Sequence, residues 1–204
     1  MSGHGGDSLK IAAVADRLQR RLERFYRLEE SPAVGPFLRE AGSGEREAVR
    51  IRDGEEGLEI EVVAPVLSSD AQPSLDGVCQ LIEGVSHFVY VADRARRMLP
   101  ATQLELELQA EIDKYVLLVL RRAPFDAGAA RTMHARLYEH VRFCHAEGTE
   151  EGDRYRLAND LAARFVRRLE HLYAEKGRHA DLRNALARFY AMGQAEKLQY
   201  ARAA

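Results

Sequence analysis

Hydrophobic residues recur at every third or fourth position over long stretches of the chain, which is the spacing of one face of an α-helix. The first stretch begins at Ser8, a residue type that caps helix N-termini, and extends to about Glu30, before Pro32 and Pro36. Its apolar positions are Ile11, Val14, Leu18, Leu22 and Phe25. Arginines occupy much of the remaining surface, so we predict an amphipathic N-terminal helix with a basic outer side.

Helical spacing returns at Ser74 and continues almost to the C-terminus. The predicted helices cover residues 74–99, 103–120, 126–147, 149–177 and 179–200, the last of them weakened at Gly193. Pro100 ends the first of these, and Thr102 with Glu105 has the residue types of a capping box at the start of the second. Residues 115–120 are apolar on every side, so we expect the second helix to be the most enclosed.

Capping residues set the remaining helix boundaries. Asp126 and Thr149 are the expected N-caps of the two helices that follow residue 121. Gly148 and Gly177 are the expected terminal glycines of the same two helices.

Residues 47–63 change to period-two alternation, which predicts a β-hairpin with a loop from Gly54 to Gly57. One register satisfies both faces of the hairpin. It sets Ile51 opposite Ile60, Val49 opposite Val62, Arg50 opposite Glu61 and Arg52 opposite Glu59. Two strands alone are barely stable in water, so the hairpin must lie on helices, pair with its own copy or accept a partner strand.

These elements predict a mainly α fold, a bundle of five or six helices with one appended β-hairpin. The predicted organisation is an N-terminal helix and linker over 1–45, the hairpin over 46–66 and a helical bundle over 74–204. The linker includes the glycine-rich stretch 41–44. We expect one main domain overall.

Composition limits the possible functions. The net charge is −2, with 30 basic and 32 acidic residues, so we expect neither nucleic acid nor a membrane as partner. No apolar run approaches the length needed to cross a bilayer, and the N-terminus lacks the pattern of a signal peptide. With only two cysteines, Cys79 and Cys144, in no paired motif, these features favour a cytoplasmic protein.

His87 is the strongest candidate for acid–base chemistry. If helices 74–99 and 103–121 are antiparallel neighbours, His87 lies level with Asp113, where a carboxylate can orient the imidazole. A polar pocket there would draw on His87, Tyr90, Glu107, Glu111 and Asp113. The alternative is a solvated pair between His87 and Glu83, one helical turn away.

A second group of polar residues lies in the predicted helix 126–147. His140 and Cys144 are one turn apart there and are weak candidates for binding a soft cation. No known metal-binding spacing supplies further ligands, so we expect no metal site.

Phosphate-binding and nucleophile motifs are absent from the sequence, and no cofactor is expected. The sequence therefore favours a non-catalytic helical interaction or scaffold protein that self-associates or binds a protein partner. The alternative is an enzyme or small-ligand-binding protein that uses the polar His/Glu pocket.

Overall fold

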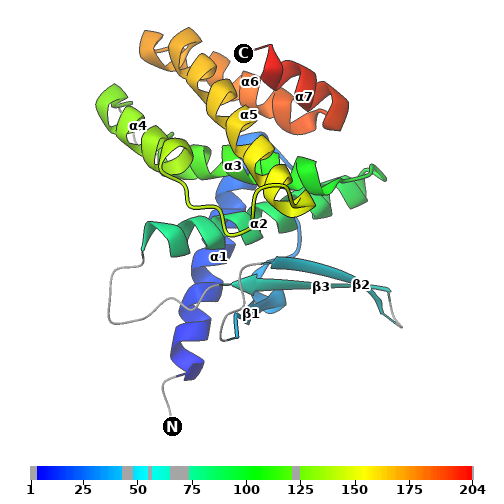
Figure 1. The fold of residues 1–204 in the computed structure, drawn as a ribbon. Helices are drawn as coiled ribbons and strands as arrows, with labels where there is room; N and C mark the ends of the chain where they lie inside the picture. Colours follow the sequence, from blue (N-terminus) through cyan, green and yellow to red (C-terminus); the bar gives the residue numbers. More distant parts are fainter. Residues whose placement is uncertain (1–3, 43–47, 55–56, 65–73, 121–124, 204) are drawn as a thin grey trace. The chain divides into compact units, whose positions relative to one another are not determined.

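The computed structural model describes residues 4–42, 48–54, 57–64, 74–120 and 125–203 and confirms the mainly helical fold class. Seven α-helices and a small sheet are present in these ranges (Figure 1). Contacts divide the chain into two compact units, which are described separately. Unit 1 comprises Met1–Arg24 and Leu28–Met98, and unit 2 comprises Phe25–Arg27 and Leu99–Ala204.

The division falls within the segment 74–204 that the sequence grouped as one bundle. Unit 1 contains the helix α2 (Leu75–Arg96) together with the sheet, and the later helices belong to unit 2. The expected domain boundaries and the single main domain stay predictions.

The N-terminal helix α1 spans His4–Tyr26, so Ser8 lies inside the helix and the predicted N-cap was wrong. The helix also ends earlier than predicted. Arg27 has a left-handed backbone with φ of 59°, which stops the helix before the prolines are reached.

Two buried polar residues of α1, Gln19 and Glu23, hold the segment that follows the helix. The Gln19 amide oxygen accepts from the backbone N–H of Val34 at 2.7 Å, and its nitrogen donates to the Pro32 carbonyl at 2.9 Å. Glu23 accepts from the backbone N–H of Ser31 at 2.9 Å. These bonds position the short helix η1 (Gly35–Phe37) and the strand that follows it.

The sheet has the strand order β1-β3-β2, with β1 at Leu38–Glu40, β2 at Ala48–Gly54 and β3 at Gly57–Ala64 (Figure 1). The predicted hairpin register is confirmed. β2 and β3 are antiparallel, with Ile51 opposite Ile60, Val49 opposite Val62, Arg50 opposite Glu61 and Arg52 opposite Glu59.

The sequence did not predict β1, which pairs parallel with β3. The ends of the predicted loop, Gly54 and Gly57, pair with each other, and the residues between them lie outside the described ranges, as do Ser43 and Gly44 of the predicted linker.

Helix α2 covers one face of the sheet. It begins after Ser74, whose side chain accepts from the backbone N–H of Gly77 at 3.1 Å. α2 packs against β2 and β3, and Gly84 allows the close approach. A Cβ at that position would lie 3.1 Å from Cγ1 of Val62, which is itself buried.

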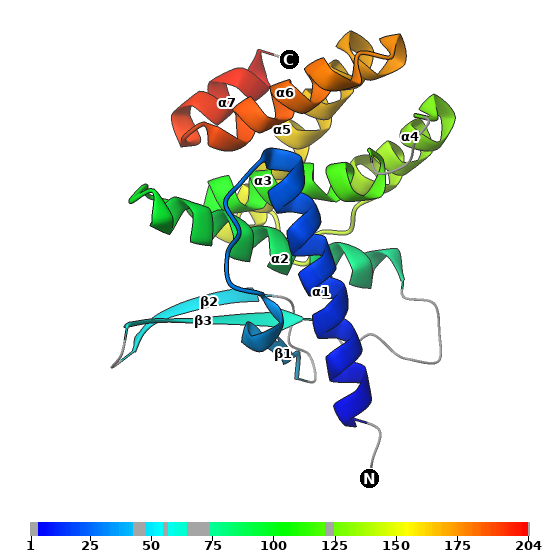
Figure 2. The same cartoon turned by 180° about the vertical axis from the view of Figure 1, so that it is seen from behind.

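Unit 2 is built around helix α5 (Glu150–Leu172), which packs against α3 (Gln103–Leu118) and α7 (Gln194–Arg202) (Figure 2). The capping box of Thr102 and Glu105 at the start of α3 is confirmed, as is the Thr149 cap of α5. α6 (His179–Ala191) is separated from α7 at Gly193, where the sequence predicted a weak point.

Two helices of unit 2 are shorter than predicted. α4 covers only Ala127–His134 after its predicted cap Asp126 and continues as one π-helical turn, η2 (Ala135–Glu139), so the prediction of a helix to residue 147 was wrong. α5 stops at Leu172 and leads through the short helix η3 (Ala174–Lys176) to Gly177, which has a left-handed backbone.

In the described part of the chain, none of the helices combines the length and the apolar character that crossing a membrane requires.

Candidate functional site

The histidine that the sequence singled out is buried in α2. The side chains of His87 and Glu83, one turn apart, are 8% and 6% exposed. The expectation of a solvated pair is therefore wrong. Tyr90 is also buried, and its ring centre lies 5.1 Å from the guanidinium carbon of Arg94. α2 thus carries a row of polar side chains at positions where a core helix ordinarily has apolar ones.

The acidic candidates lie on α3 and are not equivalent. Glu107 and Asp113 are buried, whereas Glu111 is half-buried and accepts a 2.8 Å hydrogen bond from Nζ of Lys114. Because α3 belongs to unit 2 and His87 to unit 1, the predicted meeting of His87 with this acidic segment stays a prediction.

Asp113 belongs to a buried network of polar side chains within unit 2. Its Oδ1 accepts from the Tyr26 hydroxyl at 2.5 Å and from the amide nitrogen of Gln109 at 2.9 Å. The Gln109 amide oxygen in turn accepts from Nζ of Lys197 at 2.7 Å. An ammonium can only donate, so Lys197 fixes which end of the Gln109 amide faces Asp113.

Aromatic rings surround the same network. Tyr26 stacks on Tyr190 with ring centres 4.4 Å apart, and Nζ of Lys197 lies 5.0 Å from the ring centre of Phe189. Burial, reinforced by the charge of Asp113, raises the pKa of Tyr26 well above its ordinary value. The phenol therefore stays protonated and keeps donating to Asp113, which is what a structural network requires.

A second buried acid–phenol pair joins α3 to α5. The Tyr115 hydroxyl donates to Oε1 of Glu170 at 2.9 Å. Burial raises the pKa of Glu170 above its ordinary value and outweighs the opposing effect of the hydrogen bond from Tyr115. Burial likewise raises the pKa of Tyr115. Neither residue was among the sequence candidates.

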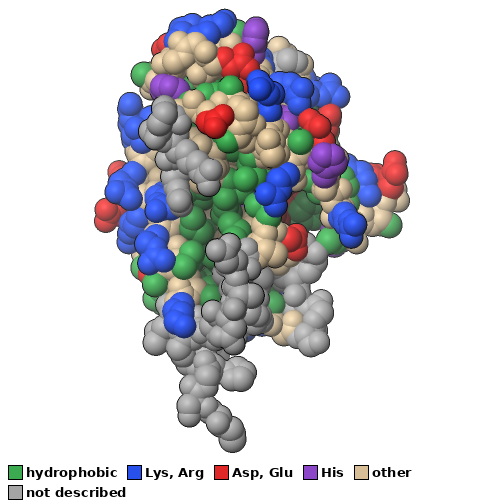
Figure 3. Space-filling model, turned by 90° about the vertical axis from the view of Figure 1, so that its left-hand side faces the viewer, with side chains coloured by type: hydrophobic (Ala, Val, Ile, Leu, Met, Phe, Trp, Pro, Cys, Tyr) green, Lys and Arg blue, Asp and Glu red, His purple; other side chains and the backbone are tan. Residues whose placement is uncertain are grey.

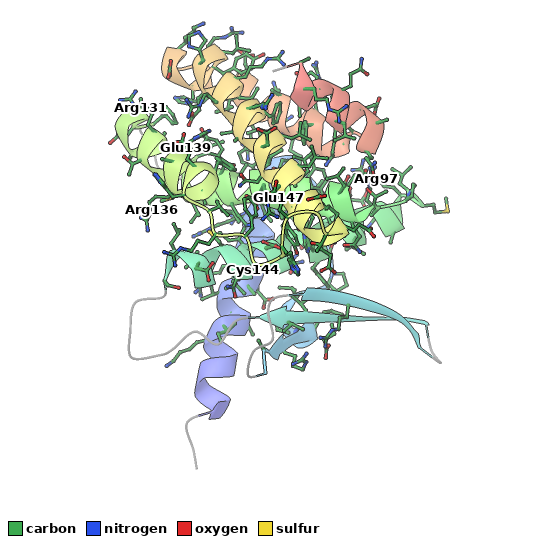
Figure 4. All side chains as sticks on the ribbon, viewed as in Figure 1. Arg97, Arg131, Arg136, Glu139, Cys144 and Glu147 are labelled. Atoms are coloured by element: carbon green, nitrogen blue, oxygen red, sulfur yellow. The ribbon has the colours of Figure 1, made fainter. Side chains whose placement is uncertain are left out.

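The structure separates the two weak metal candidates from any helix. His140 and Cys144 lie in the irregular segment after η2, and both are exposed. Figure 4 marks Cys144 in this segment. Within the described ranges, neither belongs to a cluster of three potential ligands. His134, by contrast, is buried at the end of α4, with its Nε2 3.2 Å from the Ala163 carbonyl oxygen.

A row of charged side chains crosses the sheet of unit 1. Glu61 in β3 lies between two arginines, with its Oε1 2.9 Å from Nε of Arg39 in β1 and its Oε2 3.2 Å from Nη1 of Arg50 in β2. The hydrogen bond from Arg39, with a smaller effect of Arg50, lowers the pKa of Glu61. This row lies on the face of the sheet opposite Val62 and α2.

Surface charge is mixed on the one face that is drawn in space-filling form (Figure 3). On the face drawn in Figure 3, acidic and histidine side chains lie among the basic ones. Such mixing gives no uniform attraction for a polyanion.

Sequence reasoning missed the residues that complete the buried networks, Tyr26, Gln109, Lys197 and Glu170. The only usable signal was the occurrence of polar residues at helix positions that periodicity assigns to the core. Comparisons with known protein families, with curated proteins and with solved structures found no match for this chain.

Proposed function

We propose that this protein is a non-catalytic helical interaction or scaffold protein that binds another polypeptide at the edge of its sheet. The carrying observation is the strand order, which leaves the seven-residue strand β2 at the border with no neighbour on its outer side among the described strands. An edge strand offers backbone N–H and C=O groups to an added strand.

The polar networks of unit 2 support a non-catalytic reading. Lys197, Gln109 and Asp113 are each at most 1% exposed, and they bond to one another or to Tyr26. Buried polar groups arranged in this way stabilise and specify the fold. They need no substrate to explain their presence.

Two measurements on the full chain test the proposal. Native mass spectrometry of protein purified from its own host identifies a second copy or another bound polypeptide. Hydrogen exchange then locates the contact, and we expect slower exchange at residues 48–54 in the complex than in the isolated chain. A chain that is monomeric at all concentrations, and that carries no bound polypeptide, contradicts the proposal.

A second candidate is a ligand-binding or catalytic pocket that includes His87. The burial of both Glu83 and His87 favours it, because ionisable side chains are rarely buried and those that are buried cluster at functional sites. If such a pocket exists, His87→Gln should remove a small molecule that native mass spectrometry finds on the wild type. His171→Gln is the matched control, since the His171 side chain is 75% exposed. An identical ligand mass on His87→Gln contradicts the pocket.

A further inference from the structure

We infer that the outer edge of β2 binds an extended strand of a different protein in which acidic and apolar residues alternate. The inference rests on the proposed function and names the partner. It follows from the charges that cross the sheet, from the register of β2, and from what the same edge would meet in a second copy of this chain.

Charge alternates across the three strands. Arg39, Glu61 and Arg50 form a row that reads basic, acidic, basic from β1 to β2, and both ion pairs lie within 3.2 Å. A strand added beyond β2 would place its own residue next to Arg50, where an acidic residue continues the alternation. A guanidinium has five N–H donors, so one arginine side chain can bind more than one carboxylate.

The pairing of a basic residue in β2 with an acidic residue in β3 is repeated along the strand. Arg52 stands opposite Glu59, just as Arg50 stands opposite Glu61. Positions 50 and 52 share one face of the strand, since residues two apart do so in any strand. The inner neighbour of β2 thus has the sequence Leu-Glu-Ile-Glu-Val over 58–62, and this pattern is the template for an outer neighbour.

The apolar residues of such a strand would extend the opposite face. Val62 on that face is 1% exposed and lies against Gly84 of α2. Val49 stands opposite Val62 in the register. An added strand with apolar residues between its acidic ones therefore continues both faces of the sheet at once.

A second copy of the chain is a poor occupant of this edge. Antiparallel pairing of two β2 strands centred on Ile51 sets Arg50 opposite Arg52 of the other copy. Pairing centred on Arg50 sets the two copies of Arg50 opposite each other. Like charges directly opposite one another destabilise a strand pair, and edge strands use such charges against self-pairing.

The test uses the full-length chain and a fluorescein-labelled peptide, Gly-Ser-Leu-Glu-Ile-Glu-Val-Val, with binding followed by fluorescence anisotropy. We expect binding that weakens as salt is raised, and a peptide with both Glu replaced by Lys should bind about tenfold more weakly or worse. In ¹⁵N–¹H spectra, alternate amides of residues 48–54 should become protected from exchange.

Two matched variants identify the edge. Arg50→Gln and Arg39→Gln each remove one ion pair with Glu61, but only Arg50 borders the proposed site. We expect Arg50→Gln to weaken peptide binding by about two- to fivefold and Arg39→Gln to leave it unchanged. Circular dichroism of both variants checks that the fold is retained.

The outcomes separate this inference from the proposed function. If the Glu and Lys peptides bind equally well, or if only Arg39→Gln weakens peptide binding, an acidic strand does not bind at the edge of β2. Either result still allows an interaction protein. A different result would also overturn the acidic strand and keep the interaction protein: neither peptide binds, and residues 48–54 are protected from exchange in a complex of two copies of the chain. If neither peptide binds and no polypeptide is associated with the purified chain, both the inference and the proposed function are wrong.

Discussion

The ammonium of Lys197 in α7 donates a 2.7 Å hydrogen bond to the side-chain oxygen of Gln109 in α3, and neither side chain is exposed. The same nitrogen lies 5.0 Å from the ring centre of Phe189 and 5.8 Å from that of Tyr190. A buried charge is tolerated only where such partners compensate for lost water. This contact therefore holds the C-terminal helix in unit 2.

We predict that Lys197→Met lowers the free energy of unfolding by about 1–3 kcal/mol, because the Gln109 oxygen loses its charged donor while the side-chain length is nearly kept. Urea denaturation of the full chain measures the change. Lys176→Met is the control, since Lys176 is exposed, and it should change stability by less than about 0.5 kcal/mol. If the two variants are equally stable, the Lys197 ammonium makes no net contribution to the free energy of unfolding.

Neighbouring leucines at the end of α3 give a second test. Leu117 is 6% exposed, whereas Leu118 is half-buried. We expect Leu117→Ala to cost about 2–5 kcal/mol and Leu118→Ala clearly less, because only the first leaves a cavity in an enclosed site. Amide exchange should also be slowest in α3. Fast exchange across 115–118, or a cost of less than about 1 kcal/mol for Leu117→Ala, would contradict the enclosed position of this helix.

The sequence predicted features that depend on residues close together in the chain. The caps at Thr102, Asp126 and Thr149 each involve a side chain and an N–H two or three residues later. The hairpin register followed from the match of apolar and charged positions across a short loop. Local signals of this kind are complete within a window of about ten residues.

Features that depend on distant residues were not predictable. Lys197 and Gln109 are 88 positions apart, and Tyr26 and Asp113 are 87 apart. The strand β1 has only three residues, too few for an alternating pattern. Nothing in the local sequence indicates which distant groups will meet.

The helix predicted to reach residue 147 fails for the same reason. Asn159 of α5 donates to the Leu137 carbonyl at 3.3 Å, and Arg156 donates to the His145 carbonyl at 3.1 Å. Backbone oxygens that receive bonds from another helix no longer depend on their own helix to be satisfied. The candidate His87 was identified from its residue type and from its expected position level with Asp113, and its burial could not be read from the sequence.

Gly152 in the first turn of α5 should not tolerate a side chain. A Cβ there would lie 2.0 Å from the Ala146 carbonyl oxygen and 2.8 Å from Oγ1 of Thr149. We expect Gly152→Ala to destabilise the protein by about 1–3 kcal/mol, despite the higher helix propensity of alanine. Thermal unfolding measures the change.

Gly128 in α4 is the matched control for that substitution. A Cβ at Gly128 meets only Oδ1 of the capping residue Asp126, at 3.2 Å, so it requires a far smaller adjustment than a Cβ at Gly152. The gain in helix propensity offsets this adjustment, and Gly128→Ala should change stability by less than about 1 kcal/mol. Gly152→Ala as stable as the wild type would show that the turn before α5 is arranged differently.

The pair of Tyr115 and Glu170 makes stability depend on pH. Burial raises the pKa of Glu170 above its ordinary value of 4.5, so the folded chain keeps this proton to a higher pH than the unfolded chain does. At pH values below the unfolded pKa both states are protonated, and the contribution of Glu170 to stability is fully present. As pH rises through the folded pKa, that contribution is lost, because the unfolded state has already released its proton.

We therefore predict that Glu170→Gln becomes more stable relative to the wild type as the pH rises from about 4 to about 7. Glutamine has the shape of the protonated acid, and its side-chain oxygen can still accept the hydrogen bond that the Tyr115 hydroxyl donates at 2.9 Å to Glu170. Urea denaturation of both proteins across this range measures the difference.

Tyr115→Phe is the complementary variant, because it removes the hydrogen-bond donor to Glu170. It should lower the free energy of unfolding by about 1–3 kcal/mol near neutral pH, and by less where Glu170 is protonated. A difference between Glu170→Gln and the wild type that is the same at every pH would mean that this carboxyl titrates alike in the folded and unfolded chains.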